Sequence, residues 1–400
     1  MRSTTPAPTV VSPHVLSART AVAVVFGLNG LALASWFSRV PAAREALELS
    51  AGQLGLLLLT SSVGAVLALP VAGMVTHRLG TGRAVMTAVV LAATGLTLSG
   101  VGAAVFEAPI MVGVGLFLLG YGCGTGEVAM NVEGAAVERR LGRTIMPRFH
   151  AAWSLGTVAG GVIGAGCAQV GLSVAAHLIL AAAVTLVGTL AAARRFLPPD
   201  PEQVTTQARG GGAQLLAAWR EPRTLLIGLL VLVMAFTEGT ANDWLAVAFV
   251  DGHEVSEAVG AAAFAVFVAA MTLGRTVGTV ALDAWGRAPV LAATIVVAAV
   301  GAAVAVLAGS WMLALVGVVL WGLGASLGFP VGMSAAADEE QRASVRVSVV
   351  AAIGYTAFLA GPPLVGLLGD RFGVLRALLV VPILLMPALV LVPATRQPRQ

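Results

Sequence analysis

Apolar stretches about as long as a lipid bilayer is thick follow one another along nearly the whole chain. A hydrocarbon core about 30 Å thick needs roughly 20 apolar residues per helix. Twelve such segments are separated by short polar breaks. They are predicted at about residues 20–40, 53–76, 84–106, 109–132, 148–170, 173–193, 224–250, 256–282, 288–309, 311–335, 345–368 and 373–393. This pattern predicts an all-α polytopic membrane protein with twelve transmembrane helices.

The longest polar interruption, at 197–222, divides the predicted spans six and six. Its prolines and its run of three glycines favour a flexible linker. The two halves also repeat weakly, since Gly-Arg-Ala-Val, ending at Val85, returns as Gly-Arg-Ala-Pro-Val, ending at Val290. Two six-helix repeats indicate a transporter with its site between the halves, near the membrane midplane. The predicted regions are a disordered cytoplasmic tail at 1–18, six-helix bundles at 19–196 and 223–395, and the cytoplasmic linker between them.

The distribution of charged residues along the chain also predicts how the protein is oriented in the membrane. The chain is 58% hydrophobic and 10% charged, whereas soluble domains carry about 25% charged residues. All 23 basic side chains are arginine, and 18 of them fall on the side of the chain ends. The opposite loops hold Arg39, Arg44, Arg371 and Arg376, and Arg275 lies within a span. This bias predicts two cytoplasmic termini and excludes nucleic acid as the reason for the basic charge.

Abundant Ala, Gly, Val and Arg, all with GC-rich codons, indicate a bacterial source. We therefore expect the protein to lie in the bacterial cytoplasmic (inner) membrane, surrounded by membrane lipid. We also expect it to be a monomer. No nucleotide-binding loop, metal-binding pattern or catalytic constellation occurs, so the sequence predicts neither an enzyme nor a cofactor or metal site.

Charged side chains inside spans are costly and are therefore functional candidates. Glu238 falls near the middle of the seventh span, and a buried carboxyl group there can bind and release a proton. Asn242 lies one turn further on the same face, followed by Asp243 and Trp244. We predict proton coupling at Glu238 and Asp243 and substrate binding at Asn242 and Trp244. A purely structural pairing of Glu238 across the bundle is the alternative.

The fourth span carries a second acidic candidate. Glu127 is followed by Asn131 on the same helical face. We predict a coupling role for Glu127 and substrate binding for Asn131, with an inner-gate salt bridge as the alternative for Glu127. Asn29, Trp36 and Tyr355 are further candidates for substrate binding, although Trp36 could instead anchor the helix at the membrane interface.

Two basic residues are candidates for gating. His150 begins the fifth predicted span beside Arg148 and could titrate or act as a structural donor. Arg275, about two turns inside the eighth span, could neutralise an acid in the cavity or extend to the cytoplasmic surface.

The loop between spans 2 and 3 reads Gly73-Met-Val-Thr-His77-Arg78-Leu-Gly80-Thr-Gly82-Arg83, and the second half has Asp283-Ala-Trp-Gly286-Arg287. Both segments resemble the loop motif of the major facilitator superfamily, with His77 in place of the usual Asp. The resemblance covers nearly all of 19–395. It implies alternating access by two pseudo-symmetric bundles, with Gly73, His77, Arg78, Gly80, Arg83, Asp283 and Arg287 as gating or structural residues.

A narrower resemblance is to the fucose permease-like bacterial branch. It rests on Gly120 to Asn131 in span 4, His150 to Gly156 at the start of span 5, and Glu238 to Trp244 in span 7. That branch implies a proton-coupled symporter of a small polar, sugar-like solute. The alternative is a proton-antiport exporter of drugs or metabolites, because Gly156 to Ala165 is similar to an antiporter pattern but lacks its proline. A non-transporting membrane enzyme or receptor is the remaining alternative.

Overall fold

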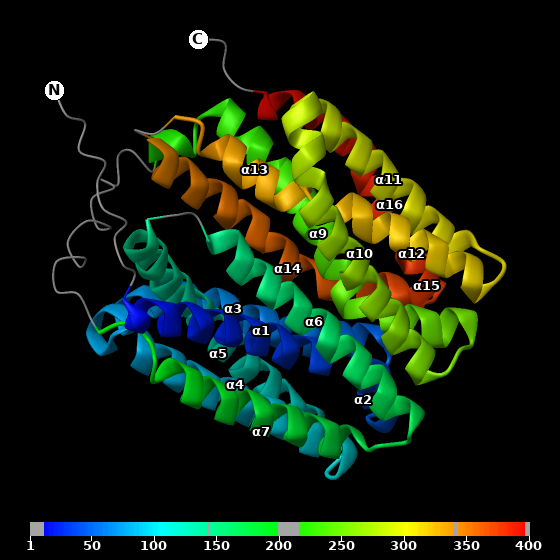
Figure 1. Cartoon of the computed structure of the whole chain (residues 1–400). Helices are drawn as coiled ribbons and strands as arrows, with labels where there is room; N and C mark the ends of the chain where they lie inside the picture. The colour runs from blue at the N-terminus through cyan, green and yellow to red at the C-terminus, as the bar shows by residue number, and fades with distance from the viewer. Residues whose placement is uncertain (1–11, 143–144, 199–215, 340–341, 397–400) are drawn as a thin grey trace, which may run out of the picture.

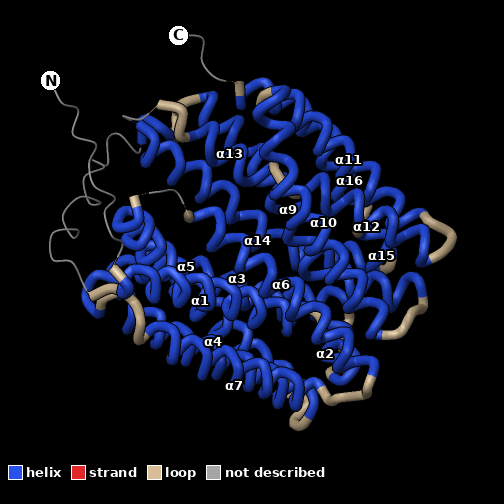
Figure 2. Tube along the Cα trace, viewed as in Figure 1, coloured by secondary structure: helices blue, strands red, loops and turns tan. Residues whose placement is uncertain are grey.

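Twelve helices in the structure, a computed structural model, are long and apolar enough to cross a membrane, which confirms the predicted fold class. The structure describes residues 12–142, 145–198, 216–339 and 342–396. Figure 2 shows only helices and loops in these ranges. The spans of the first half are α1 (Pro13–Phe37), α3 (Ala51–Leu79), α4 (Thr81–Ala104), α5 (Pro109–Leu141), α6 (Met146–Gln169) and α7 (Val174–Ala193).

In the part of the second half that the structure describes, four spans are single helices and two are joined from shorter pieces. Its elements are α9 (Pro222–His253), α10 (Glu257–Trp285), α11 (Arg287–Leu307), α12 (Trp311–Ala325), α13 (Gly328–Ala336), α14 (Ala343–Phe372), α15 (Val374–Ala377), α16 (Val380–Ala388) and the 3₁₀ helix η3 (Leu389–Thr395). The breaks between α12 and α13 and within the last span were not predicted. Pro387 and Pro393, which cannot donate a backbone hydrogen bond, lie in the last span where it narrows to a 3₁₀ helix.

The first helix begins earlier than the sequence analysis predicted. Residues 1–18 were expected to be a disordered tail, but α1 starts at Pro13. The Ser12 side chain accepts a hydrogen bond from the His14 backbone, and proline at the first helical position favours this start. Val15 and Ala18 are buried in a cluster with Phe196 and Leu197, which explains why the helix extends this far. Most of the predicted linker, 199–215, lies outside the described residues.

A short helix, α2 (Val40–Ala46), was also not predicted. It follows α1 at the end of the bundle that lies away from the chain ends (Figure 1). Although seven residues cannot cross a bilayer, Val40, Pro41, Ala42 and Ala43 are all buried. Segment α2 therefore belongs to the packed protein rather than to a solvated loop.

The two halves meet along two helix pairs, α3 with α14 and α6 with α10 (Figure 1). Small residues allow close approach at both, as in other membrane helix pairs. A Cβ atom on Gly55 of α3 would lie 2.5 Å from the Pro362 carbonyl oxygen of α14. On α6, a Cβ atom on Gly161 would lie 3.0 Å from the Ala265 side chain of α10. These equivalent pairs hold the halves against each other.

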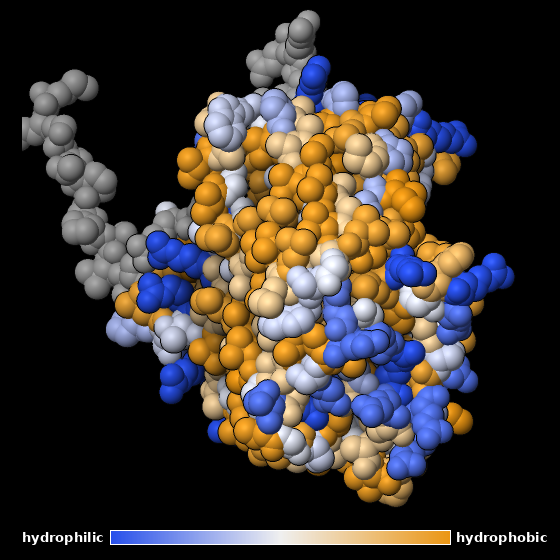
Figure 3. All heavy atoms as spheres, turned by 90° about the vertical axis from the view of Figure 1, so that its right-hand side faces the viewer, coloured by the Kyte–Doolittle hydropathy of each residue, from blue (hydrophilic) through white to orange (hydrophobic). Residues whose placement is uncertain are grey.

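The outer surface of the bundle is largely apolar. Large side chains such as Ile110, Leu155, Val280 and Leu307 are more than half exposed. Figure 3 shows apolar residues over much of one face, with the hydrophilic residues gathered in separate patches. A water-soluble protein rarely exposes such broad apolar areas, whereas a lipid-facing surface requires them. The fold is therefore that of an integral membrane protein.

Candidate functional site

A large cavity lies between the two halves. Its volume is about 1670 Å³, and its walls come from α1, α3, α5 and α6 on one side and from α9, α10, α13 and α14 on the other. Pro147, Arg148, Arg287 and Arg396 line it at the end of the bundle that holds the chain ends. The cavity is large enough for a small molecule, since ligand pockets typically measure about 300–1,000 Å³.

The opposite end of the cavity is closed. Trp36, Phe37 and Leu58 line the cavity there, and beyond them the ends of the two halves that lie away from the chain ends pack together. Trp36 is almost completely buried there, at 1% exposure. The structure therefore represents a state whose central cavity opens on the side of the chain ends only.

An ion pair in the cavity joins two predicted candidates. The Arg275 Nη2 atom of α10 lies 2.9 Å from the Glu238 Oε2 atom of α9, and Arg275 Nε donates to the Ser326 carbonyl at 3.3 Å. Both side chains line the cavity. A pairing of Glu238 across the bundle was the alternative to its proton role, and in this state Arg275 compensates its charge. Of the two roles predicted for Arg275, the structure places it beside the acid.

Glu127 faces the cavity from the other half. Its side chain is exposed to the cavity on α5, and in the described residues it takes part in no ion pair. It is close enough to interact electrostatically with the Tyr355 hydroxyl group of α14. His150 of α6 similarly faces Arg275 of α10. The cavity thus brings titratable groups of the two halves toward each other across open space.

Three further predicted residues line the cavity. They are Asn29 on α1 and Asn242 and Asp243 on α9, one turn from Glu238. Asp243 is partly buried, and in the part of the chain that is described no hydrogen bond or ion pair involves its side chain. Carboxylates and amides at these positions can accept hydrogen bonds from a polar solute.

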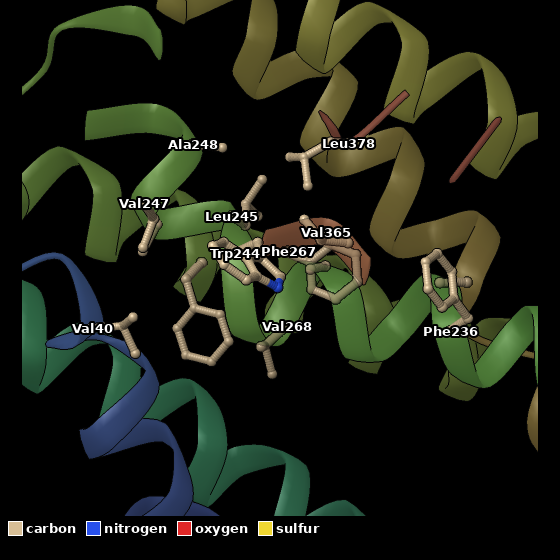
Figure 4. Packing of buried hydrophobic residues seen from close by; sticks show 14 of the residues in the cluster. Val40, Phe236, Trp244, Leu245, Val247, Ala248, Phe267, Val268, Val365 and Leu378 are labelled. Carbon is tan, nitrogen blue, oxygen red and sulfur yellow. The ribbon is translucent and has the colours of Figure 1, made fainter. Parts of the chain in front are cut away.

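Two residues predicted to bind substrate do not reach the cavity. Trp244 is fully buried in the core of the second half, near Phe267 and Val268 (Figure 4). The Asn131 amide instead donates to the Glu127 carbonyl within its own helix, at 2.8 Å. Both residues directly follow a cavity residue, and one step along an α-helix turns the side chain by about 100°, so neither side chain lines the cavity.

Several hydroxyl groups that line the cavity were not predicted from the sequence. They belong to Ser61, Ser62, Ser154, Thr272 and Thr276. In helices rich in glycine and alanine, serine and threonine are also common as packing residues, so their sequence gives no distinguishing signal. Together with the aromatic side chains of Trp153, Phe329 and Phe358, they make the wall both polar and apolar.

The loop-motif residues behave differently in the two halves. Gly80 between α3 and α4 and Gly286 between α10 and α11 have φ of 79° and 78°, values that favour glycine. This agreement supports the sequence repeat. His77, Arg78 and Arg83 are exposed, and the described ranges give them no ion pair. A Cβ atom on Gly73 would touch nothing within 4 Å.

The second half has the ionic contacts that this loop of the first half lacks. Asp338 binds Arg287 at 2.6 Å and Arg223 at 2.7 Å, and Arg287 also donates to Ser334 at 3.0 Å. Asp283 is exposed and lines the cavity mouth. These contacts tie together the ends of α9, α11 and α13.

A second ionic cluster lies nearby. Glu221 accepts hydrogen bonds from Arg346 and from Thr224, and Arg346 also contacts Glu339 at 3.1 Å. Burial opposes ionisation of Glu221, but these hydrogen bonds together outweigh it and hold the pKa of Glu221 below its usual value.

The fold and cavity define a polytopic transporter. The model of the Major Facilitator Superfamily matches residues 22–263 and 228–400, and the chain belongs to this family. An uncharacterised MFS-type transporter of Yersinia pestis is 31% identical over 363 residues, which cover 89% of this chain and 90% of that protein. These findings confirm the predicted family and the prediction that the protein is not an enzyme.

Two solved structures show the same fold at low sequence identity. A bacterial homologue of the human lysosomal transporter Spinster, inward-facing and unoccupied, has a TM-score of 0.77 and 15% identity, covering 96% of this chain and 98% of that one. The fucose:proton symporter FucP of E. coli has a TM-score of 0.64 and 17% identity, covering 95% and 98%. FucP in its outward conformation gives a similar TM-score of 0.65.

Proposed function

We propose that this protein is a secondary active transporter that moves a small polar, sugar-like solute together with protons by alternating access. The observation that carries the proposal is the central cavity, to which each half contributes carboxyl groups. A solute bound there contacts both halves, so a rocking motion of one half against the other can expose it to either side. We place the protein in the bacterial inner membrane with both termini in the cytoplasm, which makes the present state inward-facing.

Three carboxyl groups are proposed for proton coupling: Glu127, Glu238 and Asp243. Glu127 and Asp243 face the cavity without a cationic partner among the described residues, so their charge is the more costly. Proton binding at Glu238 would break its pair with Arg275. Arg275 would then be free to donate hydrogen bonds to solute oxygens, which links proton binding to solute binding.

The wall of the cavity supports a polar, uncharged solute. Hydroxyl and amide groups of Ser61, Ser154, Asn29, Asn242 and Thr272 offer hydrogen-bond donors and acceptors on several sides. Aromatic side chains, including Trp153 and Phe358, supply flat apolar surfaces. Sugar rings present both alternating hydroxyl groups and apolar faces. The symporter FucP has the same fold, which supports this class of solute as a proposal.

Uptake into proteoliposomes with an imposed pH gradient tests the proposal. A mixture of sugars, polyols and related neutral solutes is presented, and mass spectrometry measures what accumulates. We expect accumulation when the interior is alkaline and the protein is oriented as proposed. Accumulation driven by an acidic interior would instead support the proton-antiport exporter, which the glycine pattern from Gly156 to Gly164 favours. No gradient-dependent movement of any solute would contradict both.

A further inference from the structure

Two ion pairs cross between the halves at the closed end of the cavity. Arg39 directly precedes α2 and Arg44 lies in its last turn, and they face Glu257 and Asp251 in the second half. Arg44 contacts Asp251 directly, whereas Arg39 Nη2 lies 4.0 Å from Glu257 Oε2. By distance alone, Arg44–Asp251 would be the stronger of the two ion pairs. When burial is considered, Arg39–Glu257 becomes the more important pair.

The two pairs differ in their exposure to solvent. The Arg44 and Asp251 side chains are 21% and 38% exposed, so water can solvate each charge when the other is removed. Exposed ion pairs of this kind contribute little. The Arg39 side chain is only 4% exposed. Its charge therefore depends on nearby protein groups.

Arg39 has few such groups. Its Nη2 atom donates to the Leu172 carbonyl at 2.8 Å, but Nε and Nη1 are buried without a hydrogen-bond partner in the described structure. His177 lies close enough to interact with it electrostatically, and both ring nitrogens of His177 are also buried without a partner. Burial lowers the pKa of Arg39, and Glu257 acts in the opposite direction. Among these neighbours, Glu257 is the carboxylate that compensates the buried charge.

The surroundings of Arg39 connect this charge to closure of the cavity. Arg39 directly precedes α2, whose Val40 is completely buried in the same hydrophobic cluster as Val247 and Val268 of the second half (Figure 4). Trp36, three residues before Arg39, lines the closed end of the cavity. If the halves separated here, water would reach Arg39. Closure therefore buries the arginine, and separation rehydrates it.

We propose that Arg39 and Glu257 form the outer latch of this transporter, in which Glu257 makes burial of Arg39 possible and so permits the outer end to close. The inference rests on the alternating access proposed above but not on the solute or on protons. Loss of Glu257 leaves a buried charge uncompensated, a costly situation that opening relieves. Loss of Arg39 removes the charge and leaves Glu257 partly solvated at 31% exposure, so the outer end stays closed. The two partners thus have opposite effects.

Distances between spin labels measure both ends of the molecule without solute or pH gradient. For the outer end the labels are placed at Val170→Cys and Leu307→Cys, and for the inner end at Leu79→Cys and Trp285→Cys, all exposed positions. Cys123 and Cys167 are replaced by Ala. We expect Glu257→Gln to lengthen the outer distance, shorten the inner one and raise the outward-open population on the order of tenfold. Arg39→Met should leave the outer end closed.

The exposed pair provides the matched control. Asp251→Asn removes the same kind of charge beside α2, and we expect it to change the populations by less than about threefold. The double variant Arg39→Met/Glu257→Gln should return the closed distances, and it also remains informative if Glu257→Gln alone does not fold. The proposal is overturned if Asp251→Asn opens the outer end as much as Glu257→Gln, or if Arg39→Met or the double variant opens it. Absence of solute transport would leave this result unaffected.

Discussion

At the scale of single residues, charge compensation separates candidates that look alike in the sequence. Glu127, Glu238 and Asp243 could all be recognised as acids inside predicted spans, and all three line the cavity. Arg275 could be recognised as a candidate to neutralise an acid, but its pairing with Glu238 could not be predicted, because the two residues lie 37 positions apart on different helices. Trp244 could not be separated from cavity residues, since the rotation of α9 about its axis depends on its packing. Sequence spacing shows which residues share a face of a helix. Only the packing of the helices shows whether that face lines the cavity or contacts another helix.

The role of Glu238 can be tested by Glu238→Gln, which keeps the size of the side chain but cannot cycle a proton. We expect pH-driven accumulation to be lost, because a side chain that cannot bind a proton cannot couple proton movement to solute movement, while solute counterflow persists. Uptake and counterflow in the same proteoliposomes measure this. Glu238→Asp is the control that keeps the charge. Unchanged gradient-driven uptake in Glu238→Gln would rule out its proton role.

Glu221 predicts a pH dependence of stability. Its pKa is lowered in the folded protein, so it stabilises the fold above its unfolded pKa of about 4.3, and this contribution is lost as pH falls through the folded pKa. We expect Glu221→Gln to lower the melting temperature of the purified protein at pH 7 by a few degrees. The difference from wild type should shrink as the pH falls below about 4. A difference that grew on acidification would contradict the assignment.

At the scale of elements, span number and approximate position followed from hydropathy, but ends and breaks did not. Helices such as α5 continue beyond the apolar core to Leu141, because Arg139 and Arg140 can lie in a helix outside the lipid. Helix α2 was missed because its seven residues are too few for a span and because Pro41 is its second residue. Its burial against the other half depends on contacts distant in sequence.

Helix packing through glycine gives a prediction at this scale. A Cβ atom on Gly156 of α6 would collide with the Gly27 carbonyl group of α1, whereas Gly73 of α3 has open space around it. We expect Gly156→Ala to cost about 1–3 kcal/mol of stability, seen as a lower melting temperature and reduced yield. Gly73→Ala, in an exposed part of a helix, should cause no loss. Equal effects of the two substitutions would show that close packing at Gly156 does not matter.

At the scale of the whole molecule, the two bundles and the cavity between them follow from twelve spans and a weak repeat. The conformational state of the molecule cannot be predicted in this way, because the inward-open and outward-open forms share one sequence. Which end is closed depends on contacts between the halves, such as Arg39 with Glu257 and Gly55 with Pro362. These contacts join positions more than 200 residues apart, beyond the reach of any local pattern.

Orientation is a separate prediction for the whole molecule. The arginine bias predicts that the cavity mouth faces the cytoplasm. In intact cells, an impermeant thiol reagent added outside should label Val170→Cys, in the loop after α6, and should not label Arg220→Cys, just before α9. Both positions are exposed, so burial would not explain a difference. Efficient labelling at 220 and none at 170 would invert the orientation.

Proton movement that accompanies solute movement tests the central claim most directly. Proteoliposomes containing a pH-sensitive dye receive the solute identified by the uptake screen, with no pH gradient imposed. For a symporter, solute entry should acidify the interior, and Glu127→Gln or Glu238→Gln should abolish the change without abolishing counterflow. Solute entry that leaves the internal pH constant, or makes it more alkaline, would contradict proton symport.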